Sequence, residues 1–368
     1  MKVALLTLTR GTVSGGYRKF LDRLAPLLRE QPEVESVDLF VPPRMAAPGM
    51  TAWPVNDDRR AFRGLKRMVL DLEPDVIFIP TATFVRVGNV PVVTMVHNME
   101  PLEVPFNGNR PREAMKNVLR ATFARYACWK SQRVLAVSQH VRNWLHDNWE
   151  VPAEKIGVIN PGVDPAVTSE LPMPAALAPV AGSRFIFTAG SIRPARGLED
   201  VIQALASVPA DVKLVIAGTV DPGAEPYREK MGQLARGLGV ESRILWAGHL
   251  DRTGMSWCFR NAEFFVMTSR AEACPNIVLE SMAEAAPTVS TDHQPMPELL
   301  GDAALYYRER DAMHLATRLN EAFAAPAGSW KEMGLRARSR TSAYNWANTA
   351  RETVAELQLA IDRCASST

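Results

Sequence analysis

The sequence predicts an α/β protein built from two doubly wound, Rossmann-like domains. A chain of 368 residues is longer than one ordinary hydrophobic core supports. Short unbroken apolar runs alternate with longer segments of helical periodicity, as in parallel sheets covered by helices on both faces. This alternation stops at a Pro-, Ala- and Ser-rich stretch, residues 165–182, and then starts again. Two domains joined by a linker are therefore expected.

The first domain is expected to span residues 1–165. Its expected strands are Val3–Leu8, Val37–Val41, Val76–Pro80, Val92–Val96, Val134–Val137 and Ile156–Ile159. Its expected helices are Tyr17–Glu30, Arg59–Leu72, Arg112–Ser131 and Gln139–Trp149.

The second domain is expected to span residues 166–343. Its expected strands are Phe185–Thr188, Lys213–Ala217, Ile244–Ala247, Phe264–Met267 and Thr288–Ser290, with helices that include Leu198–Ser207 and Glu225–Leu238. No strand follows a last helical stretch near Ala343–Asp362. Its pattern does not decide whether it caps the second domain or crosses back to the first.

Composition narrows the class of protein and its surroundings. The chain is 47% hydrophobic and 22% charged, as in an ordinary folded enzyme. A net charge of +2 gives no general attraction to nucleic acid, and none is expected as a partner. The four cysteines lack zinc-site spacing, so reduced thiols are expected. The apolar stretch Val3–Leu8 is too short for a signal peptide or a membrane span, which predicts a cytoplasmic location.

Ligands of open parallel sheets bind beyond the carboxyl ends of the strands, so the loops there carry the candidate residues. After the first strand, Thr9–Gly16 leads into a helix with paired glycines, whose amides allow close approach of an anion. The loop is neither GxGxxG nor a P-loop, and a plain tight turn is the alternative. His97 ends the strand Val92–Val96, where it would reach a reaction zone. A satisfied core histidine is the alternative.

Two loops of the second domain suggest a site for a phosphate and a sugar. The turn Ala189–Gly197 carries Arg193 and Arg196, and arginine forks suit diphosphate oxygens. The segment Ser269–Ala283 is more specific, since Pro275 or Asn276 would open a helix, as N1 proline or asparagine cap.

In that segment, free amides from Asn276 through Ile277 to Val278 would bind a phosphate. Glu272 and Glu280 would accept hydrogen bonds from sugar hydroxyls on either side of it. Solvent-facing arginines and unrelated surface glutamates are the alternatives. The loop Thr291–Glu298 also follows a strand and is expected to line the same cleft, without assigned roles.

Together these segments resemble the large family four of retaining glycosyltransferases. The resemblance covers essentially the whole chain: besides the loops above, it includes Ala136–Ser138, Ile159–Asp164, Pro287–Asp292 and Pro297–Leu305. The family implies the GT-B fold, in which two Rossmann-like domains face a central cleft, and a final helix, about residues 344–368, that crosses back to the first domain.

The resemblance also implies residue roles. Glu280 would hold the donor ribose, Glu272 would contact the transferred sugar near its reacting carbon, and the base would lie near Gly248 and His249. Gly16 would approach the diphosphate, and His97 would sit beside the sugar. Thus Glu272 and His97 are the catalytic candidates. The donor-binding candidates are Gly16, Arg193, Arg196, Gly248, His249, Asn276, Ile277, Val278 and Glu280.

The chain departs from the family pattern in two places. The arginine usual after the glycine of the phosphate turn is replaced by Ser191, so Arg193 would substitute for it, and Arg196 stands where a lysine is usual. Cys274 stands in a segment that often reads Gly-Phe-Pro-Asn. Because backbone amides would bind the phosphate there, this second change need not weaken binding.

The expected reaction moves a hexosyl-type sugar from a UDP- or GDP-linked donor to a hydroxyl of a glycan, lipid-linked or small-molecule acceptor. Retention of the anomeric configuration follows from the resemblance alone. The chain contains no Asp-x-Asp motif, so no metal or other cofactor is expected, and helix N-termini and arginines would neutralise the leaving group. The alternatives are a GT-B-like nucleotide-sugar epimerase and a catalytically silent nucleotide-sugar-binding protein. A dehydrogenase is disfavoured because no GxGxxG follows a strand.

The first domain is expected to hold the acceptor, and it carries clustered basic residues. Arg112, Lys116 and Arg120 recur at helical spacing beside Met115, Val118, Leu119 and Phe123. Arg59, Arg60, Arg63, Lys66 and Arg67 form a second cluster. These residues suit either a solvated charged face or a peripheral contact with anionic lipid at the inner membrane face.

Overall fold

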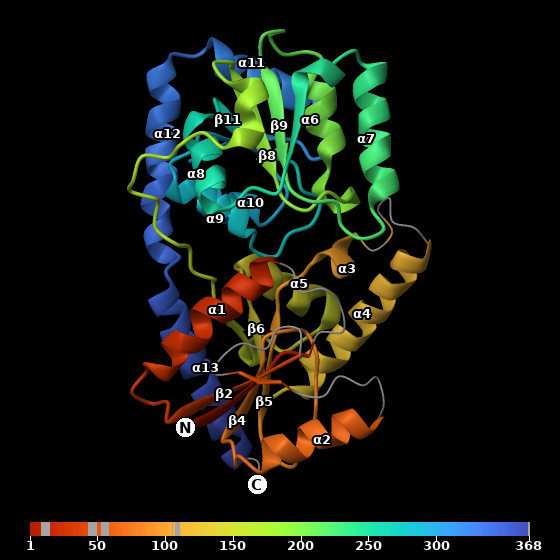
Figure 1. The fold of residues 1–368 in the computed structure, drawn as a ribbon. Coiled ribbons are helices and arrows are strands. Elements are labelled where there is room, and N and C mark those ends of the chain that lie inside the picture. Colours follow the sequence, from red (N-terminus) through yellow and green to blue (C-terminus); the bar gives the residue numbers. More distant parts are fainter. Residues whose placement is uncertain (9–14, 43–49, 53–58, 105, 107–110, 367–368) are drawn as a thin grey trace. The chain divides into compact units, whose positions relative to one another are not determined.

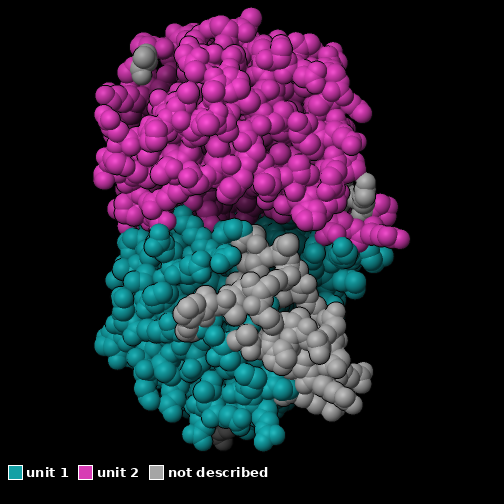
Figure 2. Space-filling view, viewed as in Figure 1, with its two compact units in different colours: residues 1–102, 115–162, 344–368 teal, residues 103–114, 163–343 magenta. Residues whose placement is uncertain are grey.

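A computed structural model describes all residues except 9–14, 43–49, 53–58, 105, 107–110 and 367–368. The chain divides into two compact units (Figure 2). The first unit consists of Met1–Leu102, Met115–Gly162 and Tyr344–Thr368. The second consists of Glu103–Ala114 and Val163–Ala343. The short segment Glu103–Ala114 thus groups with the second unit, although it lies within residues 1–165.

The described strands of the first unit form a parallel sheet in the order β3-β2-β1-β4-β5-β6-β7. All six expected strands are present, and Val92–Val96 is confirmed to the residue. The strands are β1 (Lys2–Leu6), β2 (Ser36–Val41), β3 (Thr51–Ala52), β4 (Val76–Ile79), β5 (Val92–Val96), β6 (Arg133–Ala136) and β7 (Ile156–Val158).

Helices cover this sheet because their apolar residues recur at helical spacing. For example, α1 buries Phe20, Leu21, Leu24 and Leu28 along one stripe. The helices are α1 (Gly15–Arg29), α2 (Arg59–Leu70), α3 (Glu100–Glu103), α4 (Pro111–Lys130), α5 (Gln139–Trp149) and α13 (Trp346–Ala365), with a 3-10 turn at Ala153–Lys155 (Figure 1). Both α3 and α4 contain residues of each unit, since the unit boundaries fall within them.

The final helix α13 packs in the first unit, against α1 and against strands β4 to β6. Thr349 Oγ1 donates to the carbonyl oxygen of Asn160 over 2.8 Å, and Arg133 Nε donates to Glu356 over 2.6 Å. A Cβ at Gly162 would overlap the backbone and indole of Trp346, so only glycine lets the chain pass there. The sequence pattern alone had left the place of this helix open.

The second unit contains a parallel sheet in the order β10-β9-β8-β11-β12-β13. Four strand segments, Phe185–Ala189, Lys213–Ala217, Phe264–Met267 and Thr288–Thr291, form its centre, and every residue in them except Lys213 is buried. This confirms the prediction of strands covered on both faces. The strands are β8 (Phe185–Ala189), β9 (Lys213–Ala217), β10 (Ile244–Gly248), β11 (Phe264–Met267), β12 (Thr288–Thr291) and β13 (Leu305–Tyr307).

Helix α6 packs between α7 and α11, while α9 packs with α8, α10 and α12. The helices are α6 (Leu198–Leu205), α7 (Glu225–Gly237), α8 (Arg252–Asn261), α9 (Asn276–Ala283), α10 (Met296–Leu300), α11 (Ala312–Ala324) and α12 (Ala327–Arg340). Short 3-10 turns lie at Ala175–Val180, Pro194–Arg196, Glu241–Arg243 and Thr341–Ala343.

The stretch expected to link the two domains, residues 165–182, belongs to the second unit and is partly folded onto it. Its 3-10 turn Ala175–Val180 buries Leu177 and Val180. The amide of Val167 donates to Glu284 Oε1 over 3.1 Å. Leu177 and Val180 are three positions apart and share one face of this 3-10 turn, which is too short to give a periodic signal in the sequence.

Candidate functional site

Three strand ends of the second unit meet through glycine turns. Gly190 follows β8 with φ of 129°, Gly218 follows β9 with φ of 136°, and Gly248 ends β10. The amide of Gly190 donates to Ala217 O over 3.0 Å, and that of Gly218 donates to Gly248 O over 2.7 Å. A Cβ at Gly218 would overlap the backbone of Gly190. These glycines therefore allow three backbone turns to pack at the carboxyl edge of the sheet, with exposed His249 directly after them.

Arg196 lies across the glycine turn and contacts the predicted catalytic carboxylate. Its guanidinium occupies the space that a Cβ on Gly190 would need. Its Nη1 donates to Glu272 Oε1 over 2.9 Å and to Ser269 Oγ over 2.8 Å. The side chains of Arg196 and Glu272 are 10% and 16% exposed. The fold thus brings together two predicted site residues that lie far apart in the sequence.

One N–H donor of Arg196 has no hydrogen-bond acceptor within the described part of the chain. Its Nε is buried, and no described residue accepts a hydrogen bond from it. A buried cationic donor without an acceptor is costly, so it marks a position that a ligand oxygen would satisfy. The turn Ala189–Gly197 therefore presents the unsatisfied Nε–H of the Arg196 cation next to the carboxylate of Glu272.

Hydrogen bonds hold the loop that carries Glu272 against the turn Ala189–Gly197 and against α6. Thr268 Oγ1 donates to Arg196 O over 2.8 Å, and the amide of Arg270 donates to Ala195 O over 2.8 Å. The Arg270 guanidinium forms two 2.6 Å hydrogen bonds with Asp200, whose Oδ2 also accepts from Tyr307 Oη over 3.0 Å. Burial acts to lower the pKa of Arg270, but the hydrogen bonds and charge of Asp200 raise it overall.

Helix α9 begins at Asn276, within the predicted segment. Pro275 holds the N-cap position and no side chain caps the helix, so the expectation of an N1 proline or an asparagine cap is wrong. The Val278 amide donates to Pro275 O over 3.0 Å, which leaves the amides of Asn276 and Ile277 as those that a helix start cannot satisfy itself. Glu280 is partly buried one turn further along.

Arg193, predicted to bind the diphosphate, lies at the start of the 3-10 turn Pro194–Arg196. Its Nη1 is 3.4 Å from Asp221 Oδ2, and both side chains are about one-third exposed (32% and 33%). The pair links the loop after β8 to the loop after β9. A bound diphosphate would compete with Asp221 for this guanidinium.

The loop after β12 contributes a histidine between two carboxylates. His293 Nδ1 is 3.3 Å from Glu309, and its Nε2 is 3.5 Å from Glu103. The hydrogen bond with Glu103 and the charges of both glutamates raise the pKa of His293 against the effect of burial. These contacts give the loop a structural role that its sequence had not indicated.

The first unit brings His97 under the first turn of α1. The His97 ring lies 4.5 Å from that of Phe20 and 5.9 Å from that of Tyr17, both edge to face. Burial lowers the pKa of His97 to about 3, so the imidazole is neutral at physiological pH. Part of the residue is exposed, yet its Nε2 is buried and has no hydrogen-bond partner among the described residues. Among the described residues, His97 thus lacks the Nε2 partner that a satisfied core histidine would have.

Gly16 lies in the same first turn of α1 and is exposed. The fold thus places it near His97 through its neighbour Tyr17. The preceding part of the predicted glycine loop, residues 9–14, lies outside the described residues.

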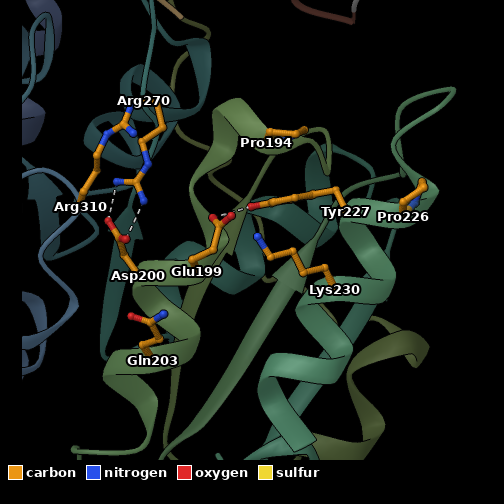
Figure 3. A pocket seen from close by; sticks show the side chains of 9 residues that line it. All are labelled: Pro194, Glu199, Asp200, Gln203, Pro226, Tyr227, Lys230, Arg270 and Arg310. Atoms are coloured by element: carbon orange, nitrogen blue, oxygen red, sulfur yellow. Dashed lines mark hydrogen bonds and ion pairs between the residues drawn. The ribbon is translucent and has the colours of Figure 1, made fainter. Parts of the chain in front are cut away.

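A cavity of about 430 Å³ lies beside this site, over the first turns of α6 and α7 (Figure 3). The Asp200–Arg270 pair forms one wall, and Tyr227 donates to Glu199 over 2.8 Å on another. None of the residues predicted to bind donor lines it. The candidate donor-binding residues of the second unit lie instead in the turn after β8, around the end of β10 and in helix α9.

Two further properties concern the described residues alone. They contain no group of three His, Cys, Asp or Glu side chains arranged to hold a metal ion. Within the same ranges, no helix combines the length and the apolar character needed to cross a membrane.

Comparisons with known proteins identify the class. A family profile described as Glycosyltransferase Family 4 matches residues 18–167, and one described as Glycosyl transferases group 1 matches residues 173–346. The solved structure of Anabaena HepE in complex with UDP and glucose superposes with a TM-score of 0.76, at 20% identity, over 97% of this chain and 98% of that one. The chain has the GT-B fold. It belongs to the family described by these two profiles, as its sequence motifs predict.

The curated relatives match this chain over only part of their own length. The serotype-specific mannosyltransferase WbdA of Escherichia coli is 25% identical over 171 residues, which are 45% of this chain and 20% of that protein. The D-inositol 3-phosphate glycosyltransferase of Mycolicibacterium vanbaalenii is 25% identical over 227 residues, 57% of this chain and 49% of the relative. The matches thus span between one-fifth and about half of these relatives.

Several residues of the site had no role assigned from sequence. Ser269, which accepts a hydrogen bond from Arg196, lies three residues before Glu272 in the predicted segment. This short spacing could have indicated from sequence that Ser269 belongs to the site. No sequence signal indicated the Asp200–Arg270 pair, because an acidic residue in the first turn of a helix is common for reasons of helix stability alone.

Proposed function

We propose that the protein transfers a hexosyl-type sugar from a nucleoside-diphosphate sugar to an acceptor hydroxyl, with retention of the anomeric configuration. The donor is UDP- or GDP-linked, and the acceptor is a glycan, a lipid-linked or a small-molecule hydroxyl. The observation that carries the proposal is the buried Arg196, which pairs with Glu272 and keeps Nε unsatisfied at the carboxyl edge of a parallel sheet.

The second unit would bind the donor through charge and backbone amides. Arg196 donates Nε–H to a diphosphate oxygen, and the first amides of α9 meet the other phosphate. Glu280 accepts hydrogen bonds from the ribose, while the base lies against Gly248 and His249. Arg193 exchanges Asp221 for the diphosphate. HepE, a structural neighbour that was solved with UDP-glucose, is in keeping with a donor of this class.

Glu272 would act near the reacting carbon. Its carboxylate accepts a hydrogen bond from Arg196, which fixes the position of the carboxylate for contact with the sugar hydroxyls. When the bond to the diphosphate breaks, negative charge grows on the leaving oxygens, where Arg196 and the start of α9 stabilise it in place. The acceptor hydroxyl attacks the face that the diphosphate leaves, so its oxygen forms the new bond to the sugar carbon and its proton passes to the departing diphosphate oxygen.

In the first unit, His97 and Gly16 complete the proposal. A neutral imidazole offers one N–H donor or one acceptor to a sugar hydroxyl without placing a positive charge there. Gly16, without a side chain, lets the start of α1 approach the diphosphate.

Metal independence is part of the same proposal. Two arginines and a helix N-terminus supply the positive charge that a divalent ion would otherwise bring to the diphosphate. Treatment with EDTA should leave turnover unchanged.

A binding panel with a turnover assay tests the function. UDP, GDP, ADP, TDP and their sugar conjugates are titrated calorimetrically into metal-stripped protein and into the Arg196→Met variant. Selective binding of one diphosphate that the variant loses, followed by acceptor-dependent release of nucleoside diphosphate, supports a transferase. Release of an epimerised sugar without acceptor would make the protein an epimerase. Binding without any turnover would make it a silent binding protein.

A peripheral contact with an anionic membrane is a separate proposal. The exposed apolar and basic residues of helix α4 support it.

A further inference from the structure

Helix α4 exposes an unusual number of large apolar side chains. Phe123 is 66% exposed and Met115 is 62% exposed, beside Tyr126, Leu119, Trp129 and Val118 at 53%, 51%, 45% and 38%. Single exposed apolar residues are ordinary on protein surfaces, but a continuous stripe on one helix marks a surface that binds something apolar.

The helix has a clear buried side. Ala114, Asn117, Ala124, Ala127 and Cys128 are buried. With about 100° per residue, they fall on one side of α4, and the exposed apolar residues fall on the other. The core of the protein therefore does not use the apolar stripe.

Basic residues border the stripe on both sides. By the same helical spacing, Arg112, Lys116, Arg120 and Lys130 lie along one border and Arg125 lies along the other. All five residues are exposed. Glu113 is the single acidic residue of α4. The helix thus combines an exposed apolar stripe with a strong excess of positive charge.

We infer that α4 lies flat on an anionic lipid bilayer, with its apolar stripe among the headgroups and upper acyl chains and its basic borders against lipid phosphates. An interfacial helix of this kind has one apolar face flanked by Lys and Arg and does not span the bilayer. No described helix, α4 included, is apolar enough to cross a membrane.

Charge selects lipid over a second copy of the chain. In a symmetric dimer through α4, the basic borders of the two copies would face each other, and like charges would oppose association. An anionic bilayer offers both an apolar interior and negative charge. The second basic cluster, on α2, adds Lys66 and Arg67 to the first unit, while the side chains of Arg59, Arg60 and Arg63 lie outside the described ones.

The inference does not depend on the proposed donor chemistry, since it concerns a helix that carries no donor-binding candidate. It deepens the acceptor side of the proposal by favouring an acceptor that resides in or at a membrane. The two can fail separately, because lipid binding and nucleotide binding are measured independently.

Vesicle flotation of the full chain tests the inference. The protein should float with phosphatidylglycerol–phosphatidylcholine vesicles and remain at the bottom with pure phosphatidylcholine. Each basic residue near an anionic surface contributes about fivefold to partitioning, so Arg112→Glu with Arg125→Glu should weaken it by about twentyfold or more. Leu119→Ser with Phe123→Ser should weaken it by about tenfold or more, and high salt should release the protein.

Matched controls lie on other helices. Lys331→Glu with Arg351→Glu reverses two exposed charges away from α4. Met313→Ser with Leu335→Ser removes two apolar side chains that are 70% and 49% exposed, close to the values for Phe123 and Leu119. Both control pairs should float like the unaltered protein, and all variants should keep their nucleotide affinity.

Three results would overturn the inference. The first is no flotation with anionic vesicles. The second is flotation that the α4 variants and the controls share equally. The third is concentration-dependent dimerisation in sedimentation velocity that Leu119→Ser with Phe123→Ser abolishes while flotation persists, because the stripe would then bind a second copy.

Discussion

The pair between Asp200 and Arg270 should be among the most costly contacts to break in the second unit. The side chains are 4% and 7% exposed and joined by two 2.6 Å hydrogen bonds. Asp200→Leu leaves the Arg270 cation buried without its partner and Tyr307 Oη without its acceptor. Removing one member of a buried ion pair costs about 3–5 kcal/mol.

That cost translates into a measurable thermal shift. In a unit of this size, each kcal/mol lowers Tm by about 2–4 °C, so Asp200→Leu should lower the transition of the second unit by about 6–20 °C. Differential scanning calorimetry of the ligand-free protein measures the shift. Any separate transition of the first unit should stay in place, which provides an internal control.

The double variant Asp200→Leu with Arg270→Met distinguishes charge burial from lost packing. Replacing both members of a buried pair by apolar side chains is often close to neutral, so the double variant should recover most of the loss. Adding Tyr307→Phe should recover the remainder, because the orphaned hydroxyl is removed. A shift below about 2 °C for Asp200→Leu, or a double variant no more stable than the single one, would refute this account of the pair.

Further predictions concern ligands and pH. Glu280→Ala should weaken calorimetric donor binding by at least about tenfold, whereas Glu272→Ala should mainly lower kcat; equal, negligible effects would remove both assignments. EDTA should leave donor affinity and turnover unchanged, and recovery of lost activity by added Mg²⁺ would contradict the metal-independent mechanism. His97 remains neutral when folded but binds a proton when unfolded, below pH about 6.5, so acid should destabilise the first unit by about 2 kcal/mol at pH 5; denaturant titrations should show that His97→Gln flattens this dependence. His293 has the opposite sign: its raised pKa stabilises the second unit below pH about 6.5, and this contribution is lost as pH rises through the folded pKa. His293→Gln should remove that loss, and an unchanged pH profile would show that its carboxylate neighbours do not stabilise the protonated form.

The sequence by itself determined the two α/β units, because long buried strands and amphipathic helices reflect local apolar patterns. Val92–Val96, Lys213–Ala217 and Gln139–Trp149 agree with prediction to the residue. By contrast, Thr51–Ala52 and Leu305–Tyr307 form strands through pairing with a neighbouring strand. Such short segments carry too few residues for a periodic signal.

The candidate site divides in the same way. The sequence identified Arg196 and Glu272 by residue type and by their position after strands. Only the tertiary structure brought the guanidinium to the carboxylate, left its Nε without a described acceptor and tied Arg270 to Asp200. These contacts join residues about 70 positions apart, and they depend on how two loops pack at the edge of one sheet.

The sequence of helix α4 likewise does not decide which of its faces is buried. Its sequence carries apolar and basic residues at helical spacing, which suit either a buried face or an exposed one. The alanines and Cys128 pack inward, and Phe123 and Met115 are left outside. Local sequence determines which residues share a helix face, whereas only the packing of the whole unit decides which face meets solvent, because burial depends on neighbours that are distant in the chain.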